Sequence, residues 1–183
     1  MRNKQLAISE AAGCAAIYGA AVILHFVFQW FGPGALTLLF GAVNESVWEH
    51  VKIFSAAYAG YALLELLWIK VPFRQYVAAK CAGLYFLMGA IIALHYTVVF
   101  LAGSHITAID IIGSAVIVIL AQALSYRLTV GDAPLRDWFV PALFLLALYY
   151  LMFFSFTVYP PRTDLFRDPM SGGFGYLERN VEN

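Results

Sequence analysis

Charged residues are scarce in this chain: Asp, Glu, Lys and Arg make up only 12% of its 183 residues, whereas a soluble domain carries about 25%. The formal net charge is zero, so no excess of basic residues predicts a nucleic-acid partner. The only two cysteines, Cys14 and Cys81, fall in apolar segments, and we expect free buried thiols rather than a disulfide. No serine nucleophile elbow, phosphate-binding loop or cysteine-pair motif occurs.

The chain is rich in long apolar segments. Crossing a hydrocarbon core of ~30 Å takes about 20 helical residues, and five segments are long enough: residues 6–31, 47–69, 76–101, 107–126 and 138–159. A sixth segment, residues 34–43, is too short to cross and is expected to be an interfacial or re-entrant helix, or an overhang of the second span. The sequence therefore predicts an all-α integral membrane protein, with a bundle of five transmembrane helices in residues 1–160 and a tail in residues 161–183.

The loops between these segments differ in positive charge. The loops at residues 31–46 and 102–106 have no Lys or Arg. The other joints carry Arg2, Lys4, Lys70, Arg74, Lys80, Arg127 and Arg136. The positive-inside rule then predicts a cell-membrane protein with a cytoplasmic N-terminus and an extracytoplasmic C-terminus. Glu65 is expected at the inner boundary, and Trp positions agree with this topology, since interfacial belts favour that residue: Trp30 and Trp48 outside, Trp68 and Trp138 inside.

The tail mixes turn-forming residues with aromatic ones. Its Pro and Gly residues rule out a further helix and favour turns. Leu165, Phe166, Phe174 and Tyr176 make it more apolar than a disordered tail needs to be. A flexible tail is the alternative, but we expect an ordered flap that folds over the outer mouth of the bundle. Phe166 or Tyr176 should then be buried near residues 44–50.

Ionisable residues gather at the predicted outer ends of the spans. Such residues are costly near hydrocarbon and usually serve a function there. The topology places seven of them at one level: His25, Glu45, Glu49, His50, His95, His105 and Asp110. Helical spacing puts Glu45, Glu49 and Lys52 on one stripe and His50 on another face. Together they predict an outward-facing polar pocket in which His25, His95 and Asp110 converge with either the Glu pair or His50.

Imidazole and carboxylate groups are ligands of zinc and iron. We therefore predict a divalent transition metal, zinc or iron, with His25, His50, His95 and Asp110 as ligands, and Glu49 or Glu45 as general base. The spacing matches neither the His-Glu-x-x-His helix nor the Glu-x-x-His pair of di-iron bundles, so several helices would have to assemble the site. A haem between two of the histidines, His25 and His95, is another possibility.

The same residues also have structural explanations. Glu45 or Glu49 can pair with Lys52, and the spacing Ser46-x-x-Glu49 fits a helix capping box, with Asn44 as another candidate cap. Three histidines have structural explanations too. His25 and His95 can be packing residues, and His105 can be a solvated loop residue.

Two segments resemble a known family. Residues 44–52, NESVWEHVK, and the tail pattern YPPR…LFRDP…GY are similar to two signatures of an uncharacterised family of small prokaryotic multi-pass membrane proteins. The resemblance covers the whole chain. It implies a multi-pass topology and no particular activity.

Three classes of function fit these observations. The first is a metal-dependent membrane-embedded hydrolase acting on a lipid or amphiphile at the outer leaflet. The second is a small-molecule or ion-coupled transporter with the same carboxylates as proton or cation sites, although five spans divide into two equal repeats only in a homodimer. The third is a noncatalytic binding or assembly subunit, since small residues at Gly13, Ala16, Gly19 and Ala20 allow close helix contact. The lipid bilayer is a partner in all three.

Overall fold

Helices form almost all of the computed structural model, which describes residues 2–132 and 134–179. The longer helices are α1 (Arg2–Phe31), α3 (Val47–Glu65), α4 (Phe73–Ala102), α5 (Thr107–Val130) and α6 (Phe139–Val158). The shorter ones are α2 (Ala35–Phe40), the 3-10 turns η1 (Leu135–Trp138) and η2 (Asp164–Phe166), and α7 (Gly175–Arg179). The described residues contain no strand beyond an isolated bridge between Arg167 and Phe174, so the predicted all-α class is confirmed.

Within the described residues, four helical segments are long and apolar enough to cross a membrane: Asn3–Phe31, Phe73–Ala102, Thr107–Val130 and Leu135–Val158. They are consistent with a multi-pass membrane protein. Helix α3 is shorter, with 19 residues, and it carries Glu49, Lys52 and Glu65 in place of apolar residues. Eleven of its residues are nevertheless buried, because α1 and α4 pack against it.

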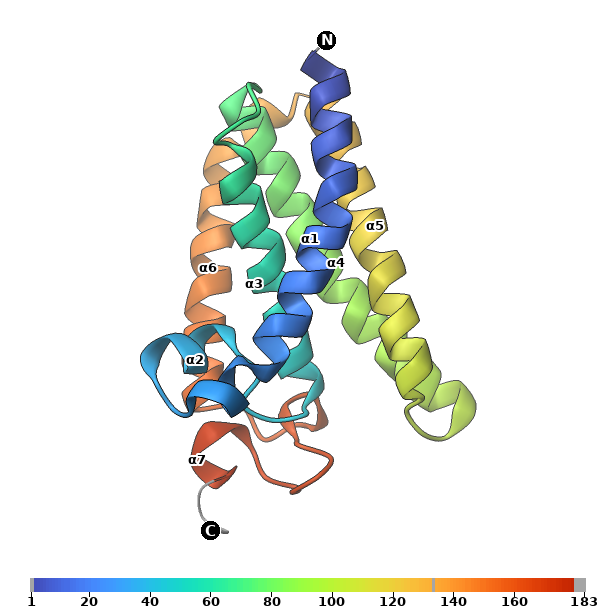
Figure 1. Ribbon diagram of the computed structural model, residues 1–183, viewed down its shortest axis with the longest axis vertical. Helices are drawn as coiled ribbons and strands as arrows, with labels where there is room; N and C mark the ends of the chain where they lie inside the picture. The colour runs from blue at the N-terminus through green and yellow to red at the C-terminus, as the bar shows by residue number, and fades with distance from the viewer. Residues whose placement is uncertain (1, 133, 180–183) are drawn as a thin grey trace.

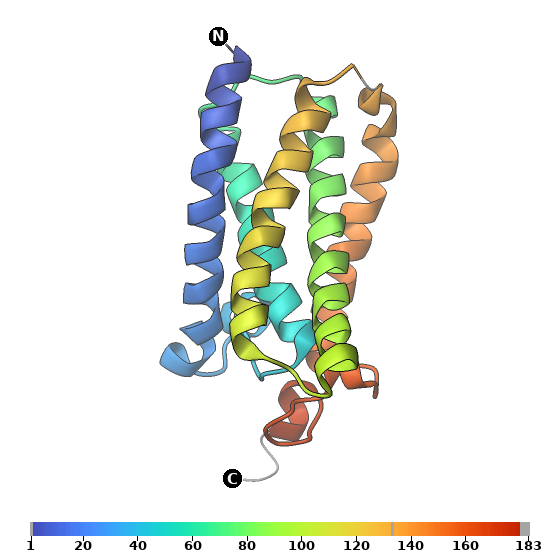
Figure 2. The ribbon, with the colours of Figure 1, turned by 90° about the vertical axis from the view of Figure 1, so that its right-hand side faces the viewer.

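The long helices run up and down in one bundle (Figures 1 and 2). Helix α1 packs against α3 and α5, and α4 packs against α3, α5 and α6. The chain starts at one end of the bundle, here called the N-terminal end. Helix α2 and the C-terminal tail cover the opposite end, here called the tail end (Figure 1). Ile17, Val51, Leu87 and Ala121 are completely buried between the helices, so the core lies along the bundle axis.

The short apolar segment folds back on the tail end. Helix α2 ends at Phe40, and residues 41–46 are not helical, so the segment is not an overhang of α3. The Ala42 amide donates a hydrogen bond of 3.3 Å to the Leu24 carbonyl, which holds this loop against α1. A side chain at Gly41 would lie 3.3 Å from the backbone of Phe28, so glycine permits the close approach.

The tail is ordered over its described length. Phe166 is 6% exposed, with its ring 4.8 Å from Trp48 and 5.4 Å from Phe156 between centroids. Tyr176 lies 6.0 Å from Phe28. The predicted burial of Phe166 near residues 44–50 is confirmed.

The expectation that Pro and Gly rule out a helix in the tail is wrong. Helix α7 has five residues, and η2 adds a single 3-10 turn. Instead of interrupting the helix, the glycines lie before it and at its start: Gly172 has φ +74°, and Gly175, the first residue of α7, has φ +62°. The Glu178 carboxylate accepts a hydrogen bond of 3.0 Å from the Phe174 amide, which satisfies a free donor at the helix start.

Three residues expected at membrane boundaries lie in the core. Trp48 is 5% exposed because it stacks on Phe153 at 4.5 Å between centroids. Lys80 and Glu65 are also buried, and Lys80 lies about two turns inside α4. Lys80 therefore does not belong to the loop charges. The other Lys and Arg residues of those joints still fall at the N-terminal end.

Candidate functional site

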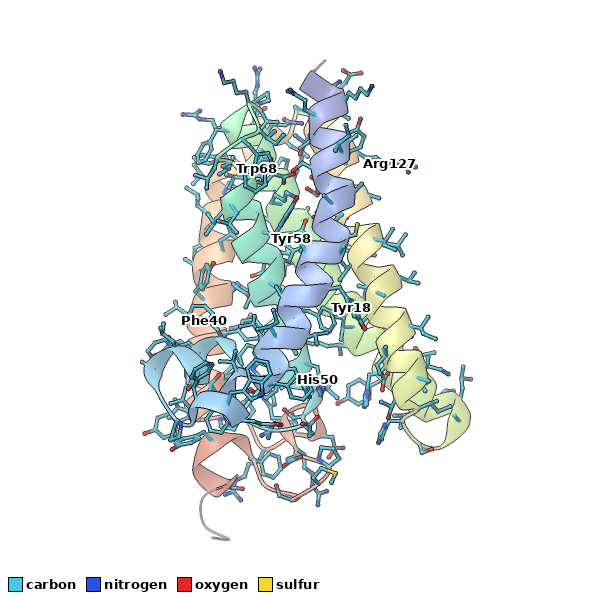
Figure 3. The ribbon with its side chains drawn as sticks, viewed as in Figure 1. Tyr18, Phe40, His50, Tyr58, Trp68 and Arg127 are labelled. Atoms are coloured by element: carbon cyan, nitrogen blue, oxygen red, sulfur yellow. The ribbon has the colours of Figure 1, made fainter. Side chains whose placement is uncertain are left out.

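Three of the predicted site residues meet at the tail end of the bundle. His25 comes from α1, His50 from the first turn of α3, and Glu45 from the loop before α3. The Glu45 Oε1 atom is 3.7 Å from His25 Nε2, and Glu45 Oε2 is 3.7 Å from His50 Nε2. One ligand atom from each residue lies within 4.8 Å of the other two. Figure 3 places His50 at the tail end of the bundle, below the core residue Tyr58.

The local fold explains why Glu45 faces the histidines. Ser46 caps α3, since its hydroxyl accepts a hydrogen bond of 3.4 Å from the Glu49 amide. The Asn44 side chain accepts one of 3.0 Å from the Ser46 amide and fixes the preceding turn. Glu45 therefore lies outside the helix, and the expected stripe of Glu45, Glu49 and Lys52 does not form. The expected capping box is only half made, because the Glu49 carboxylate turns to Val43 N, 2.9 Å away.

A backbone hydrogen bond orients the His50 ring. Its Nδ1 atom lies 2.9 Å from the Ser46 carbonyl oxygen, an acceptor, so we assign the ring proton to Nδ1. Nε2 then keeps a lone pair and points at Glu45. This is the arrangement of many metal-binding histidines, whose second nitrogen donates to a carbonyl or carboxylate.

Glu49 is engaged elsewhere. Its Oε2 atom is 2.6 Å from Lys52 Nζ, and the two side chains are 2% and 1% exposed. Lys52 also donates to the Leu38 carbonyl at 2.9 Å and to Thr157 Oγ1 at 3.2 Å. The pair thus ties α3 to α2 and α6. A general base needs a free carboxylate that reaches the substrate, and this one is occupied by two donors.

His95 and Asp110 form a separate pair between α4 and α5. His95 Nδ1 and Asp110 Oδ2 are 3.8 Å apart, and both side chains are partly exposed. His95 is close enough to His50 for their charges to interact. His105 is exposed in the loop between α4 and α5. The residues predicted to share one level therefore form two clusters: His25, Glu45 and His50 in one, and His95 with Asp110 in the other.

A second group of ionisable residues was not predicted as a site. Lys80 Nζ lies 2.7 Å from Glu10 Oε2, 2.9 Å from Glu65 Oε2 and 3.2 Å from Gln122 Oε1. Ser125 donates to Glu10 Oε1 at 3.1 Å, and Tyr76 donates to Glu65 Oε2 at 2.8 Å. Four helices, α1, α3, α4 and α5, contribute to this buried network.

Sequence reasoning missed this network because its members are isolated along the chain. Glu10, Glu65 and Lys80 each lie near the end of a different apolar segment, so each could be a boundary residue. One signal was available. Three ionisable residues of both signs lie inside or beside spans, at the same predicted end of the bundle. Charges within apolar helices usually pair with one another.

The chain belongs to a family of unknown function, DUF6512, whose profile matches residues 3–176. No curated protein and no solved structure matches this chain. The family agrees with the resemblance found in the sequence and adds no activity.

Proposed function

We propose that this chain is a five-span protein of the cell membrane that binds one divalent transition metal, zinc or iron, through His25, Glu45 and His50. In this proposal α3 is the fifth span, the N-terminus is cytoplasmic, and the tail end faces outward. The bound metal serves the hydrolysis of a lipid or amphiphile at the outer leaflet.

The spacing of the three ligand atoms carries the proposal. Each Glu45–His distance is 3.7 Å, which is too long for a hydrogen bond. Two ligands that each lie ~2.1 Å from a tetrahedral ion are about 3.4 Å apart. The two contacts reach different oxygens of Glu45, and one ligand atom of each residue lies within 4.8 Å of the other two, so the three side chains would move slightly closer together to hold a tetrahedral ion. Two His and one carboxylate also form the ligand set of a known class of catalytic zinc site, which leaves one coordination position open for water.

The residues around the site suggest how the reaction is supported. A bound metal of this kind supplies a water that is deprotonated near neutral pH. Because Glu45 is a ligand and Glu49 is held by Lys52, the proposed proton acceptor becomes His95, with Asp110 as its positioning residue. The tail, anchored by Phe166 on Trp48, is proposed to limit the access of water at this end.

Metal binding is tested with protein purified in detergent, stripped by a chelator and titrated calorimetrically with Zn²⁺. We expect about one ion per chain, and loss of binding in His25→Ala and in Glu45→Gln. The matched control is His105→Ala, which removes an exposed histidine of the same end and should bind normally. Absence of stoichiometric binding by the unaltered protein, or normal binding by His25→Ala, would overturn the site.

Catalysis is tested separately from binding. The zinc-loaded protein is assayed against ester and amide amphiphiles in mixed micelles. His95→Ala should bind zinc normally but hydrolyse substrate roughly 10²- to 10⁴-fold more slowly, the usual range for a lost general base. Equal activity in His95→Ala would remove that residue from the mechanism, and inactivity of the unaltered protein towards all such substrates would refute the hydrolase.

The topology is tested by cysteine labelling in intact cells. In a background without Cys14 and Cys81, Ser171→Cys should react with a membrane-impermeant maleimide before the cells are permeabilised. Cysteine at Lys4 is the control and should react only afterwards. The reverse pattern would place the tail in the cytoplasm and contradict the outward-facing site.

A second candidate is an ion-coupled carrier, favoured by the buried Glu10–Lys80–Glu65 network. Ionisable groups inside a bundle commonly mark proton or ion pathways. Proton uptake by proteoliposomes that persists after removal of the metal and stops in Glu65→Gln would favour the carrier over the hydrolase.

A further inference from the structure

The buried network at Lys80 has an unequal number of charges. It contains two carboxyl groups, Glu10 and Glu65, and one ammonium group, Lys80. Their exposed fractions are 3%, 0% and 6%. With all three ionised, the network would have a net charge of −1. An uncompensated charge away from water costs several kcal/mol, and a buried acid avoids this cost by binding a proton.

The surrounding residues add no positive charge. Helix α5 presents only the uncharged Gln122 and Ser125. The titratable groups on the other packed helices are Cys14, Tyr58, Tyr61, Tyr76 and Cys81. Thiols and phenols lose their protons with ordinary pKa values of about 8.5 and 10, and their ionisation would only add negative charge. Among the described residues, a bound proton is therefore the simplest source of neutrality.

We propose that Glu10, Glu65 and Lys80 form a proton-binding site that holds one exchangeable proton at neutral pH, shared by the two carboxyl groups. Both oxygens of Glu10 already have donors, Lys80 and Ser125. On Glu65, Oε2 accepts from Tyr76 and Lys80, whereas Oε1 is buried without a hydrogen-bond partner. A neutral carboxyl group tolerates an unsatisfied oxygen better than a carboxylate does.

Tyr58 gives an independent indication of a ligand at this position. Its side chain is 1% exposed, and its hydroxyl has no hydrogen bond of ordinary geometry, although it lies beside Ser125. Lys80 Nζ lies 5.4 Å from the centre of its ring. Figure 3 shows Tyr58 at mid-height in the bundle. The Tyr58 hydroxyl therefore borders the network beside Ser125, which itself donates to Glu10, and in this proposal it shares the proton or a water molecule that carries it.

A cavity of about 120 Å³ at the N-terminal end is lined by Asn3, Leu6, Val71, Pro72, Thr129 and Val130. It stops short of the network, since Leu6 lies one helical turn before Glu10 and Thr129 lies one turn after Ser125. In this proposal, protons reach the site from the N-terminal end, opposite the proposed metal site.

Infrared spectroscopy of the purified full-length protein tests the proposal directly. At pH 7 we expect the carbonyl stretch of a buried protonated carboxyl group, which shifts in D₂O because the proton exchanges. Glu65→Gln and Glu10→Gln should each abolish the band, since the remaining carboxylate is then balanced by Lys80. Lys80→Met should roughly double it, because both carboxyl groups then bind protons.

Glu49→Gln is the matched control, because it alters a buried carboxylate outside the network and should leave the band unchanged. Helix content measured by circular dichroism verifies that each variant is folded. Absence of the band at pH 7, or its persistence in both Glu10→Gln and Glu65→Gln, would refute the proton site. Neither result depends on metal binding at the tail end.

Discussion

The bundle contains two buried ionic groups that differ in their charge balance. At the tail end, one carboxylate, Glu49, meets one ammonium group, Lys52, and each has further hydrogen-bond partners. Toward the N-terminal end, two carboxyl groups share Lys80, and one oxygen of Glu65 has no partner. The two groups have nearly equal burial.

This comparison separates a structural ion pair from a group that is prepared to react. In a balanced pair each charge has a counter-charge, and removing one partner leaves the other isolated. An unbalanced group can restore neutrality by protonation. The balance of charge, rather than burial alone, therefore distinguishes the Glu10–Lys80–Glu65 network from the Glu49–Lys52 pair.

The largest effect should come from breaking the balanced pair. Lys52→Met leaves Glu49 buried without a counter-charge, beside the Val43 amide, which can only donate and so favours the ionised form; we expect a loss of about 3–5 kcal/mol in the free energy of unfolding. The measurement is unfolding by SDS titration in mixed micelles. The double variant Glu49→Leu/Lys52→Met should regain most of the stability, because a buried pair can be replaced by apolar residues. A small loss in the single variant would show that the pair is hydrated.

Removing the cation from the unbalanced group should have a smaller effect. In Lys80→Met the glutamates can bind protons, so we expect a loss of about 1.5–3 kcal/mol at neutral pH, typical of lost hydrogen bonds to charged groups. Because the folded state then holds more protons than the unfolded chain, stability should fall as pH rises. SDS titrations at several pH values measure this slope. A loss equal to that of Lys52→Met with no slope would contradict the difference between the groups.

Neutralising one glutamate in each cluster should give the clearest difference between the Glu10–Lys80–Glu65 network and the Glu49–Lys52 pair. Glu65→Gln keeps an acceptor for Tyr76 and leaves Glu10 paired with Lys80, so we expect a change of about 1 kcal/mol or less. The same substitution at the balanced pair, Glu49→Gln, strands Lys52 and should cost about 3–5 kcal/mol. Thermal unfolding of the two variants side by side is the measurement. Equal losses would mean that Glu65 is ionised in the folded protein.

The smallest effect is expected where an ion pair is exposed. Arg162 and Glu178 are 2.7 Å apart in the tail, but their side chains are 77% and 38% exposed. Arg162→Ala should change the free energy of unfolding by only about 0.2–1 kcal/mol, and less at high salt. Unfolding titrations at two salt concentrations measure it. A loss as large as that of Lys52→Met would show that the tail contributes more than a surface contact.

The sequence predicted where the candidate site lies and which types of residue form it, but not which of the candidate residues meet there. The topology placed His25, Glu45 and His50 at one level, and they do meet. Sequence spacing could not show that Ser46 would start α3 and release Glu45 from the stripe of Glu49. Pairing of Glu49 with Lys52 was one of the structural explanations, and it is observed. The contact of Glu49 with Val43 could not be predicted, because it depends on the return of the loop that follows α2.

The sequence by itself determined the all-helical class and the positions of the apolar helices, because a run of about 20 apolar residues has few other stable forms. It also predicted that the tail would return to residues 44–50, because its aromatic residues need burial. Only the tertiary structure decided which charges meet. Glu10, Glu65 and Lys80 come from three helices, and their contact depends on helix rotation and depth, which are set by packing over the whole bundle rather than by any local pattern.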